Sequence, residues 1–262
     1  MSEGPRILFL GGKNIGAGCL RYLLENGFNV VGVVLNQREL SDRMRWYQST
    51  AEIACNFGVP VLSFQTVNSP TAVNAVKALS PDIHACVFYD EIFRENFLAI
   101  PPLGTVNIHM ALAEEYRGRF PCNYTILNGD SRTGVTLHRV DAGVDSGDII
   151  ADVEVPITKS DTARSLYDRC TEAGIALFCE HFGKVLDGTA NTRAQQPKPG
   201  MRTYSRKDLP RKEIDFSQPG SKIYDFIRAL TFPPFEPPFF YIGDQKMVVV
   251  PEESVASDWY DY

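Results

Sequence analysis

Short apolar runs alternate with longer segments of helical periodicity through the first part of the chain. The runs suit strands buried on both faces, and the longer segments carry apolar residues every three or four positions. The predicted strands are residues 6–12, 28–35, 59–64, 83–89 and 104–110, and the predicted helices are residues 17–27, 49–58, 69–80 and 91–100. Strands separated by helices pair in parallel, so the pattern predicts a doubly wound α/β sheet.

The pattern changes after residue 120. A helix that ends at Gly129 is followed by two β-rich runs, a long helix capped by Ser160 or Asp161, a polar linker, a further helix and a hairpin around Gly243-Asp244. The two β-rich runs span residues 133–141 and 148–157, and the long helix spans residues 162–188. The linker spans residues 189–213, the further helix residues 219–231 and the hairpin residues 239–250. We therefore expect a large α/β domain over residues 1–200 and a small β-rich C-terminal domain over residues 201–262.

Composition narrows the class of protein. At 44% hydrophobic residues the 262-residue chain can bury a full core, and its net charge of -6 argues against a nucleic-acid partner. The six cysteines show no Cys-x-x-Cys spacing, so we expect buried free thiols and no metal site. Neither a secretory signal nor an apolar run of ~20 residues is present, which predicts a cytoplasmic protein without a membrane partner.

The glycine-rich turn after the first predicted strand, "GGKNIGAG" at residues 11–18, fits neither phosphate-binding template. The Walker lysine is missing, and the glycines do not follow G-x-G-x-x-G. Asn36 and Gln37 stand where a dinucleotide site would carry an acid. A tight strand-to-helix turn is therefore expected, although an NAD(P)-dependent oxidoreductase stays open as an alternative.

Asn107 and His109 give the sharper chemical signal. They alternate with apolar residues at the end of a predicted strand, so both side chains point the same way. Ligands of open α/β sheets bind at this edge. A neutral imidazole can accept a proton from an amine, and a carboxamide can donate to a developing oxyanion. A carboxylate beside the imidazole would complete the set, and residues 139–150 offer Asp141, Asp145 and Asp148.

The stretch from "NIH" through "YRGRFPCNYTILNGDSRTGVTLHRVDAGVDSGDII" resembles the folate-dependent formyltransferases. The shared pattern is Asn-x-His, Tyr-Arg-Gly, Asn-Gly-Asp, Thr-Gly-Val-Thr and Gly-x-Asp-x-Gly-Asp. The resemblance implies a Rossmann-like catalytic domain that uses 10-formyltetrahydrofolate. It also implies that His109 is a general base on the acceptor amine, that Asn107 stabilises the oxyanion, and that Asp145 orients His109 and stabilises its charged form. The folate is expected between two walls, formed by Asp90, Glu91 and Ile92 and by Val140, Asp141, Ala142, Gly143 and Val144.

The resemblance leaves three classes of acceptor: methionyl-tRNA, glycinamide ribonucleotide and nucleotide-linked amino sugars. The tRNA enzymes carry a longer basic C-terminal barrel and a Ser-Leu-Leu-Pro stretch, where this chain has an acidic end and Ala111-Leu112-Ala113-Glu114. The glycinamide enzymes lack the C-terminal section. The segment at residues 223–249 looks like the tail of the sugar N-formyltransferases, which indicates the third class.

We therefore expect an acceptor such as dTDP-4-amino-4,6-dideoxyglucose, a dTDP-3-amino sugar or GDP-perosamine, destined for lipopolysaccharide O-antigen. The resemblance also implies a homodimer. A methionyl-tRNA formyltransferase-like enzyme and a catalytically silent folate- or nucleotide-binding protein remain alternatives. The expected substrate-binding residues are Tyr116, Arg117, Gly118, Arg119, Phe120 and Tyr224.

Overall fold

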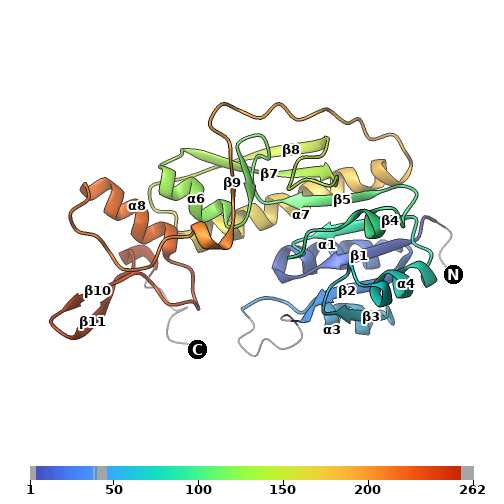
Figure 1. The fold of residues 1–262 in the computed structure, drawn as a ribbon, viewed down its shortest axis with the longest axis horizontal. Helices are drawn as coiled ribbons and strands as arrows, with labels where there is room; N and C mark the ends of the chain where they lie inside the picture. The colour runs from blue at the N-terminus through green and yellow to red at the C-terminus, as the bar shows by residue number, and fades with distance from the viewer. Residues whose placement is uncertain (1–3, 38, 40–45, 255–262) are drawn as a thin grey trace.

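A seven-stranded sheet forms the centre of the computed structural model, which describes residues 4–37, 39 and 46–254 (Figure 1). The strand order is β3-β2-β1-β4-β5-β7-β8. Strands β1 to β5 are parallel, while β7 is antiparallel to both β5 and β8. The bounds are β1 Ile7–Gly11, β2 Val30–Asn36, β3 Val61–Phe64, β4 Ile83–Val87, β5 Thr105–His109, β7 Arg132–Arg139 and β8 Ile149–Pro156.

Apolar side chains on both faces of the sheet produce two cores. In β1, Ile7 and Phe9 join one cluster and Leu8 and Leu10 join the other, as the alternation of a strand requires. Helices α1, α3 and α7 cover the first face, and α4 and α5 cover part of the second. The α-helices are α1 Lys13–Glu25, α3 Thr50–Asn56, α4 Pro70–Ala78, α5 Glu95–Leu98, α6 Pro121–Asn128, α7 Ala163–Leu186 and α8 Gly220–Leu230. Short 3-10 helices span Arg206–Asp208 and Glu252–Ser254. The predicted doubly wound α/β sheet is confirmed.

Helix α1 begins earlier than the predicted start at residue 17. Its two internal glycines weakened the helical signal, because glycine lowers helix propensity. Gly18 has a packing reason to be there: a Cβ would lie 2.3 Å from Cδ1 of Ile175 on α7. The glycine therefore allows α1 and α7 to approach each other closely.

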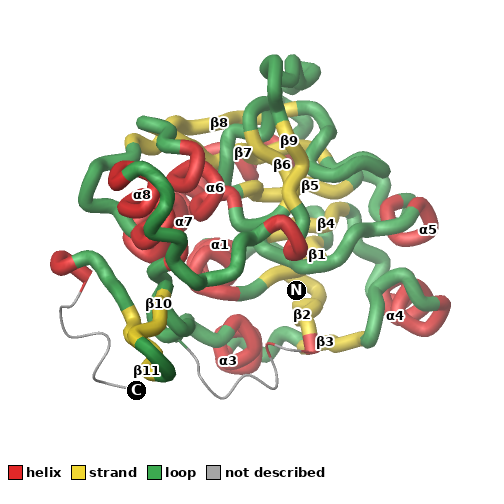
Figure 2. Tube along the Cα trace, turned by 60° about the vertical axis from the view of Figure 1, so that its left-hand side comes forward, coloured by secondary structure: helices red, strands yellow, loops and turns green. Residues whose placement is uncertain are grey.

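A small two-stranded sheet was missed by the prediction. β6 (Tyr116–Gly118) pairs in parallel with β9 (Arg202–Tyr204), and Figure 2 shows both strands next to β5. The polar segment at residues 189–213, expected as a linker, is thus tied to β6. Three-residue strands of polar composition carry too little periodicity to be recognised.

The C-terminal elements follow the predicted order. α8 packs against α6, where Nδ2 of Asn123 donates to the carbonyl oxygen of Ala229 at 2.7 Å. Strands β10 (Phe239–Ile242) and β11 (Gln245–Val248) form the predicted hairpin, which projects from the rest of the chain (Figure 1). The division into two domains near residue 200 stays a prediction.

The prediction for the cysteines needs correction, and the prediction for one loop is not tested. Cys19, Cys86, Cys122 and Cys170 are buried free thiols as expected, but Cys55 is exposed and Cys179 is half-buried. Most of the polar loop at residues 36–48 lies outside the described residues.

The N-terminus of α7 is capped differently from the prediction. Thr162 is the N-cap and exchanges hydrogen bonds with Ser165. Asp161 lies one residue earlier and is buried, and its carboxylate accepts from Thr158, Ser165 and Arg169. Burial raises the pKa of Asp161, but these donors lower it more, to about 2.

We expect the Asp161→Asn substitution to lower the free energy of unfolding by about 2 kcal/mol at neutral pH. Because the folded-state pKa is depressed, this contribution is present above the ordinary value of 3.8 and is lost as the pH falls toward 2. Urea unfolding at several pH values measures it, with Glu172→Gln on the exposed face of α7 as the control. A difference between wild type and Asp161→Asn that does not shrink on acidification would contradict the assignment.

Candidate active site

Asn107 and His109 lie on one face of β5, at the carboxyl end of the parallel strands. Their neighbours Val106 and Ile108 face the opposite core against α1 and α7. Helices α4 and α5 cover the sheet near β1, β2 and β4, so they leave this end of β5 to other elements. β6 and the loop at residues 140–148 approach it instead, through contacts to His109 and Asp145.

The imidazole of His109 is held by a backbone carbonyl. Its Nε2 lies 2.9 Å from the carbonyl oxygen of Tyr116, and the ring is buried. A carbonyl only accepts, so Nε2 carries the proton. In the neutral ring Nδ1 is then the basic nitrogen, and it lies 3.4 Å from Oδ2 of Asp145. The ring orientation thus comes from Tyr116, a contact that the sequence did not predict.

The carboxylate of Asp145 lies between several donors. Oδ2 accepts from the Gly118 N–H at 2.9 Å, and Oδ1 lies 3.4 Å from Nδ2 of Asn107. Gly118 has φ +83°, and a Cβ there would lie 2.1 Å from the carbonyl oxygen of Tyr204. Only glycine therefore allows β6 to pass between β9 and the loop that carries Asp145. The structure brings Asn107, His109 and Asp145 together.

His138 on β7 is a fourth member of this cluster that sequence reasoning missed as a site residue. It is the direct cross-strand partner of Asn107. Its Nδ1 lies 2.7 Å from the carbonyl oxygen of Arg139, so Nδ1 carries the proton and Nε2 accepts. Nδ2 of Asn107 lies 3.1 Å from that Nε2, which fixes the orientation of the amide. A histidine within the β-rich run next to the Asn-x-His strand was the available signal.

Burial and charge act in opposite directions on the two titrating groups. Burial lowers the pKa of His109, and the nearby Asp145 raises it by less, so the ring is neutral at neutral pH. Burial raises the pKa of Asp145, but His109, His138 and the Gly118 N–H together hold it well below its ordinary value. The site therefore pairs a neutral imidazole with an ionised carboxylate, which suits proton transfer from an amine.

Backbone strain gathers around this edge of the sheet. Among the described residues, five non-glycine residues have positive φ: Lys13, Ser80, Phe88, Phe120 and Asp145. All but Ser80 lie within two residues of the end of β1, β4 or β6 or in the loop between β7 and β8. Such strain clusters at functional sites, which agrees with the position of the candidate site.

The residues expected to bind folate occupy two loops beside the cluster. Asp90 accepts from Arg119 at 2.6 Å, so one expected folate residue is paired with one expected substrate residue. Glu91 is engaged by the N–H of Val67 and by Asn68. Ile92 is 64% exposed and Val144 is 37% exposed. Asp141 accepts from the Gly143 N–H and from Ser146 within its own loop. Val140 is partly buried against the core on the second face of the sheet, while Ala142 is exposed.

The residues expected to bind the acceptor do not all point toward the cluster. The ring of Tyr116 packs with Tyr204, and its hydroxyl bonds Asp130, so its carbonyl rather than its ring reaches the cluster. Phe120 begins α6 with a left-handed backbone. Arg117 donates to Gln195 at 2.6 Å. Tyr224 lies on α8, where its hydroxyl donates to Lys159.

The glycine-rich turn after β1 is filled by the chain itself. A Cβ on Gly12 would lie 1.8 Å from Oε2 of Glu39, and Nζ of Lys13 lies 3.3 Å from Oε1 of Glu39. A carboxylate in this position would repel a phosphate. The arrangement agrees with the expected tight turn and disfavours the dinucleotide alternative.

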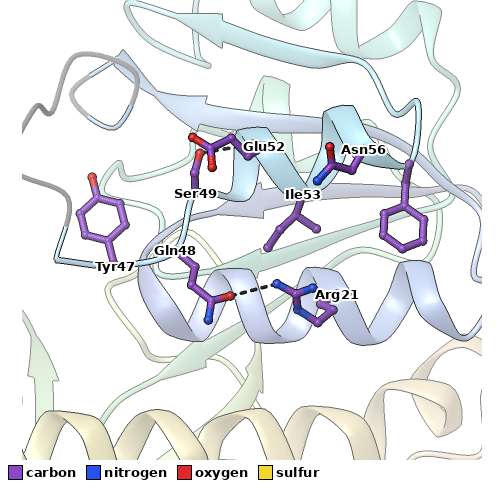
Figure 3. A pocket seen from close by; sticks show the side chains of 8 residues that line it. Arg21, Tyr47, Gln48, Ser49, Glu52, Ile53 and Asn56 are labelled. Atoms are coloured by element: carbon purple, nitrogen blue, oxygen red, sulfur yellow. Dashed lines mark hydrogen bonds between the residues drawn. The ribbon is translucent and has the colours of Figure 1, made fainter.

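A cavity of about 400 Å³ lies between α1 and α3, away from the cluster (Figure 3). Figure 3 shows Arg21 and Gln48 joined across it by a hydrogen bond of 3.0 Å. It contains none of the predicted site residues. Within the described ranges, no group of three or more His, Cys, Asp or Glu side chains is placed to hold a metal ion, and none of the helices is long and apolar enough to cross a membrane.

A protein-family model described as formyl transferase matches residues 5–181. The chain therefore belongs to the formyl transferase family, and it is a formyltransferase. It is 32% identical over 228 residues to a methionyl-tRNA formyltransferase of Bacillus licheniformis, covering 86% of this chain and 72% of that protein. It is 36% identical over 228 residues to that of Symbiobacterium thermophilum, covering 86% and 69%.

The similar solved structures include sugar N-formyltransferases. The sugar 3N-formyl transferase WlaRD, in the presence of dTDP and 5-N-formyl-THF, is 27% identical with a TM-score of 0.76, covering 94% of this chain and 85% of that one. The N-formyltransferase from Helicobacter canadensis, in complex with folinic acid and dTDP-3-aminofucose, is 26% identical with a TM-score of 0.74, covering 92% and 86%. The family resemblance of the sequence is confirmed.

The contact between Asp145 and His109 predicts a change in titration. We expect Asp145→Asn to lower the pKa of His109 further below its ordinary value of 6.5, because burial then acts without the opposing carboxylate. Histidine-selective NMR titration measures this, and the half-exposed His181 serves as the internal control. An unchanged or raised pKa of His109 would show that the carboxylate does not act on the ring.

Proposed function

We propose that this formyltransferase moves a formyl group from 10-formyltetrahydrofolate to the amine of a nucleotide-linked amino-dideoxy sugar. The observation that carries the proposal is the cluster of Asn107, His109 and Asp145 at the end of β5, in a chain that shares its fold with sugar N-formyltransferases over 94% of its length. Both structural relatives named above were solved with a folate and with dTDP or a dTDP-linked sugar.

His109 is the proposed general base. Because Nε2 donates to the carbonyl of Tyr116, the acceptor amine delivers its proton to Nδ1. Asp145 faces Nδ1 and stabilises the imidazolium ion that results. In this account Tyr116 orients the ring and Asp145 stabilises its charge, so the two tasks expected of Asp145 are divided.

Asn107 is the proposed donor to the formyl oxygen. One N–H of its amide is directed at His138 at 3.1 Å and the other at Asp145 at 3.4 Å. The second contact is long and therefore weak, so an incoming oxygen competes for that hydrogen. His138 keeps the nitrogen, rather than the oxygen, of the amide turned toward this side.

The two loops beside the cluster fit a flat, partly polar ligand. Ile92 and Val144 offer exposed apolar surface, and the loop at residues 140–144 offers backbone polar groups. When bound, 10-formyltetrahydrofolate supplies the formyl group that is transferred. We assign its contacts to the two expected walls, residues 90–92 and 140–144, with the Asp90–Arg119 ion pair at their border.

The acceptor is assigned to the side of β6 and the start of α6. Arg119 is partly exposed and directly follows Gly118, whose N–H donates to Asp145. Its guanidinium can therefore bind a diphosphate while it keeps part of its ion pair with Asp90. The net charge of -6 fits a small nucleotide substrate better than a long polyanion. A methionyl-tRNA acceptor is the second candidate, because the similar sequences named above are methionyl-tRNA formyltransferases. The role in O-antigen synthesis stays a prediction.

Incubation with 10-formyltetrahydrofolate and a panel of dTDP-, GDP- and UDP-linked 3-amino and 4-amino sugars tests this function. We expect mass spectrometry to find one formylated nucleotide sugar. His109→Asn should lower the transfer rate by roughly 10²- to 10⁴-fold, the usual contribution of a general base. His181→Asn, a substitution on the surface of α7, should leave it unchanged.

The other outcomes are equally informative. Formylation of methionyl-tRNA with no sugar modified would support the second candidate function, that of a methionyl-tRNA formyltransferase. Full activity of His109→Asn would reject the proposed base.

We also propose that the enzyme is a homodimer joined through the β10–β11 hairpin. Ile242 and Met247 share one hairpin face and are 62% and 43% exposed. An isolated two-stranded hairpin is marginally stable, and exposed apolar surface of this kind marks an interface. A second copy of the same surface would bury both.

The dimer predicts that Ile242→Lys gives a monomer in light scattering coupled to size-exclusion chromatography. Leu103→Lys, a substitution at another exposed apolar position, should keep the molar mass of the wild-type dimer. A monomeric wild type, or a dimeric Ile242→Lys protein, would exclude this interface.

A further inference from the structure

The segment at residues 193–198 crosses the surface beside the candidate active site. Every residue of this segment is exposed except Gln195, which is half-buried. Its side chain reaches inward between two elements of the site: the loop that carries Asp145, and Arg117 on β6. The contacts of the Gln195 side chain explain why it alone in this segment turns inward.

Gln195 makes three hydrogen bonds with its amide. Nε2 donates to the carbonyl oxygen of Asp145 at 2.9 Å and to that of Gly147 at 2.6 Å. Oε1 accepts from Nη2 of Arg117 at 2.6 Å. A guanidinium only donates and a carbonyl only accepts, so the two ends of the amide cannot be exchanged. The geometry therefore requires a carboxamide at this position.

The loop that Gln195 contacts needs external support. Residues 141–147 form no helix or strand, and Asp145 has φ +48°, in the left-handed region that is costly for a non-glycine residue. The two acceptors of Nε2 are the carbonyl of this strained residue itself and the carbonyl of Gly147, two residues further on. A return of Asp145 to an ordinary backbone conformation would break these bonds and turn its carboxylate away from His109.

Gln195 is itself held firmly from both sides. Ile149 and Arg193 exchange two backbone hydrogen bonds of 2.8 Å. On the other side, the N–H of Gln196 donates to the Glu114 carboxylate at 2.6 Å, and the N–H of Lys198 donates to the Glu114 carbonyl at 2.8 Å. Glu114 belongs to the turn that connects β5 and β6. The segment that carries Gln195 is therefore anchored to the same strands that carry the site residues.

We propose that Gln195 is a positioning residue of the active site, which holds the Asp145–Gly147 loop in the conformation that aims the Asp145 carboxylate at His109. The role in turnover rests on the proposed function, whereas the effect on His109 does not. The groups that act on His109 are Asp145, His138, Arg117 and the Tyr116 carbonyl. Among them only Asp145 is anionic, so its displacement leaves His109 harder to protonate.

Gln195→Met removes all three hydrogen bonds and keeps the length of the side chain. We expect kcat to fall roughly 10- to 100-fold with little change in KM for folate or sugar, as for a misplaced catalytic group. We also expect the NMR titration of His109 to shift to lower pH. Gln196→Met is the matched control, because the exposed Gln196 contacts Glu114 through its backbone alone.

Gln195→Glu separates the two ends of the amide. It keeps an acceptor for Arg117 and loses both donors to the loop, so we expect kcat to fall as far as in Gln195→Met. Wild-type kcat in Gln195→Glu, or a kcat and a His109 titration in Gln195→Met that match Gln196→Met, would overturn the proposal. If the wild-type enzyme formylates no acceptor, the proposed function fails, and the His109 titration still tests the positioning role.

Discussion

A largely buried carboxylate beside two imidazoles, that of Asp145, is the constraint on which the arrangement of this site depends. The ionised Asp145 requires polar partners in a place that excludes most water, and the fold brings them from three strands. Gly118 comes from β6, His138 from β7, and Asn107 and His109 from β5. The loop after β7 adopts a left-handed conformation at Asp145 to complete the set.

The same constraint explains the shape of the surroundings. β6 lies close to the cluster only because Gly118 permits it, and β9 holds β6 from outside. The Tyr116 carbonyl then fixes the proton of His109 on Nε2 and leaves Nδ1 basic. Backbone atoms thus set the protonation pattern of the site, while side chains are the groups to which we assign the chemistry.

The sequence predicted the sheet, the order of its elements and the shared direction of Asn107 and His109, because these depend on local periodicity. Asp145 was identified by resemblance, since three aspartates in one loop are equivalent by composition alone. His138, the Tyr116 carbonyl, Gln195 and the β6–β9 pair were missed. Each depends on cross-strand register or on a backbone contact between distant segments, and neither leaves a periodic signal.

We propose that formyl transfer takes place between Asn107 and His109. A crystal structure with the nucleotide sugar and an inert 10-formyl folate analogue tests it most directly. We expect the formyl oxygen ~3 Å from Nδ2 of Asn107 and the acceptor amine within hydrogen-bond reach of Nδ1 of His109. A formyl group bound beyond the reach of both side chains, for example in the cavity between α1 and α3, would contradict it.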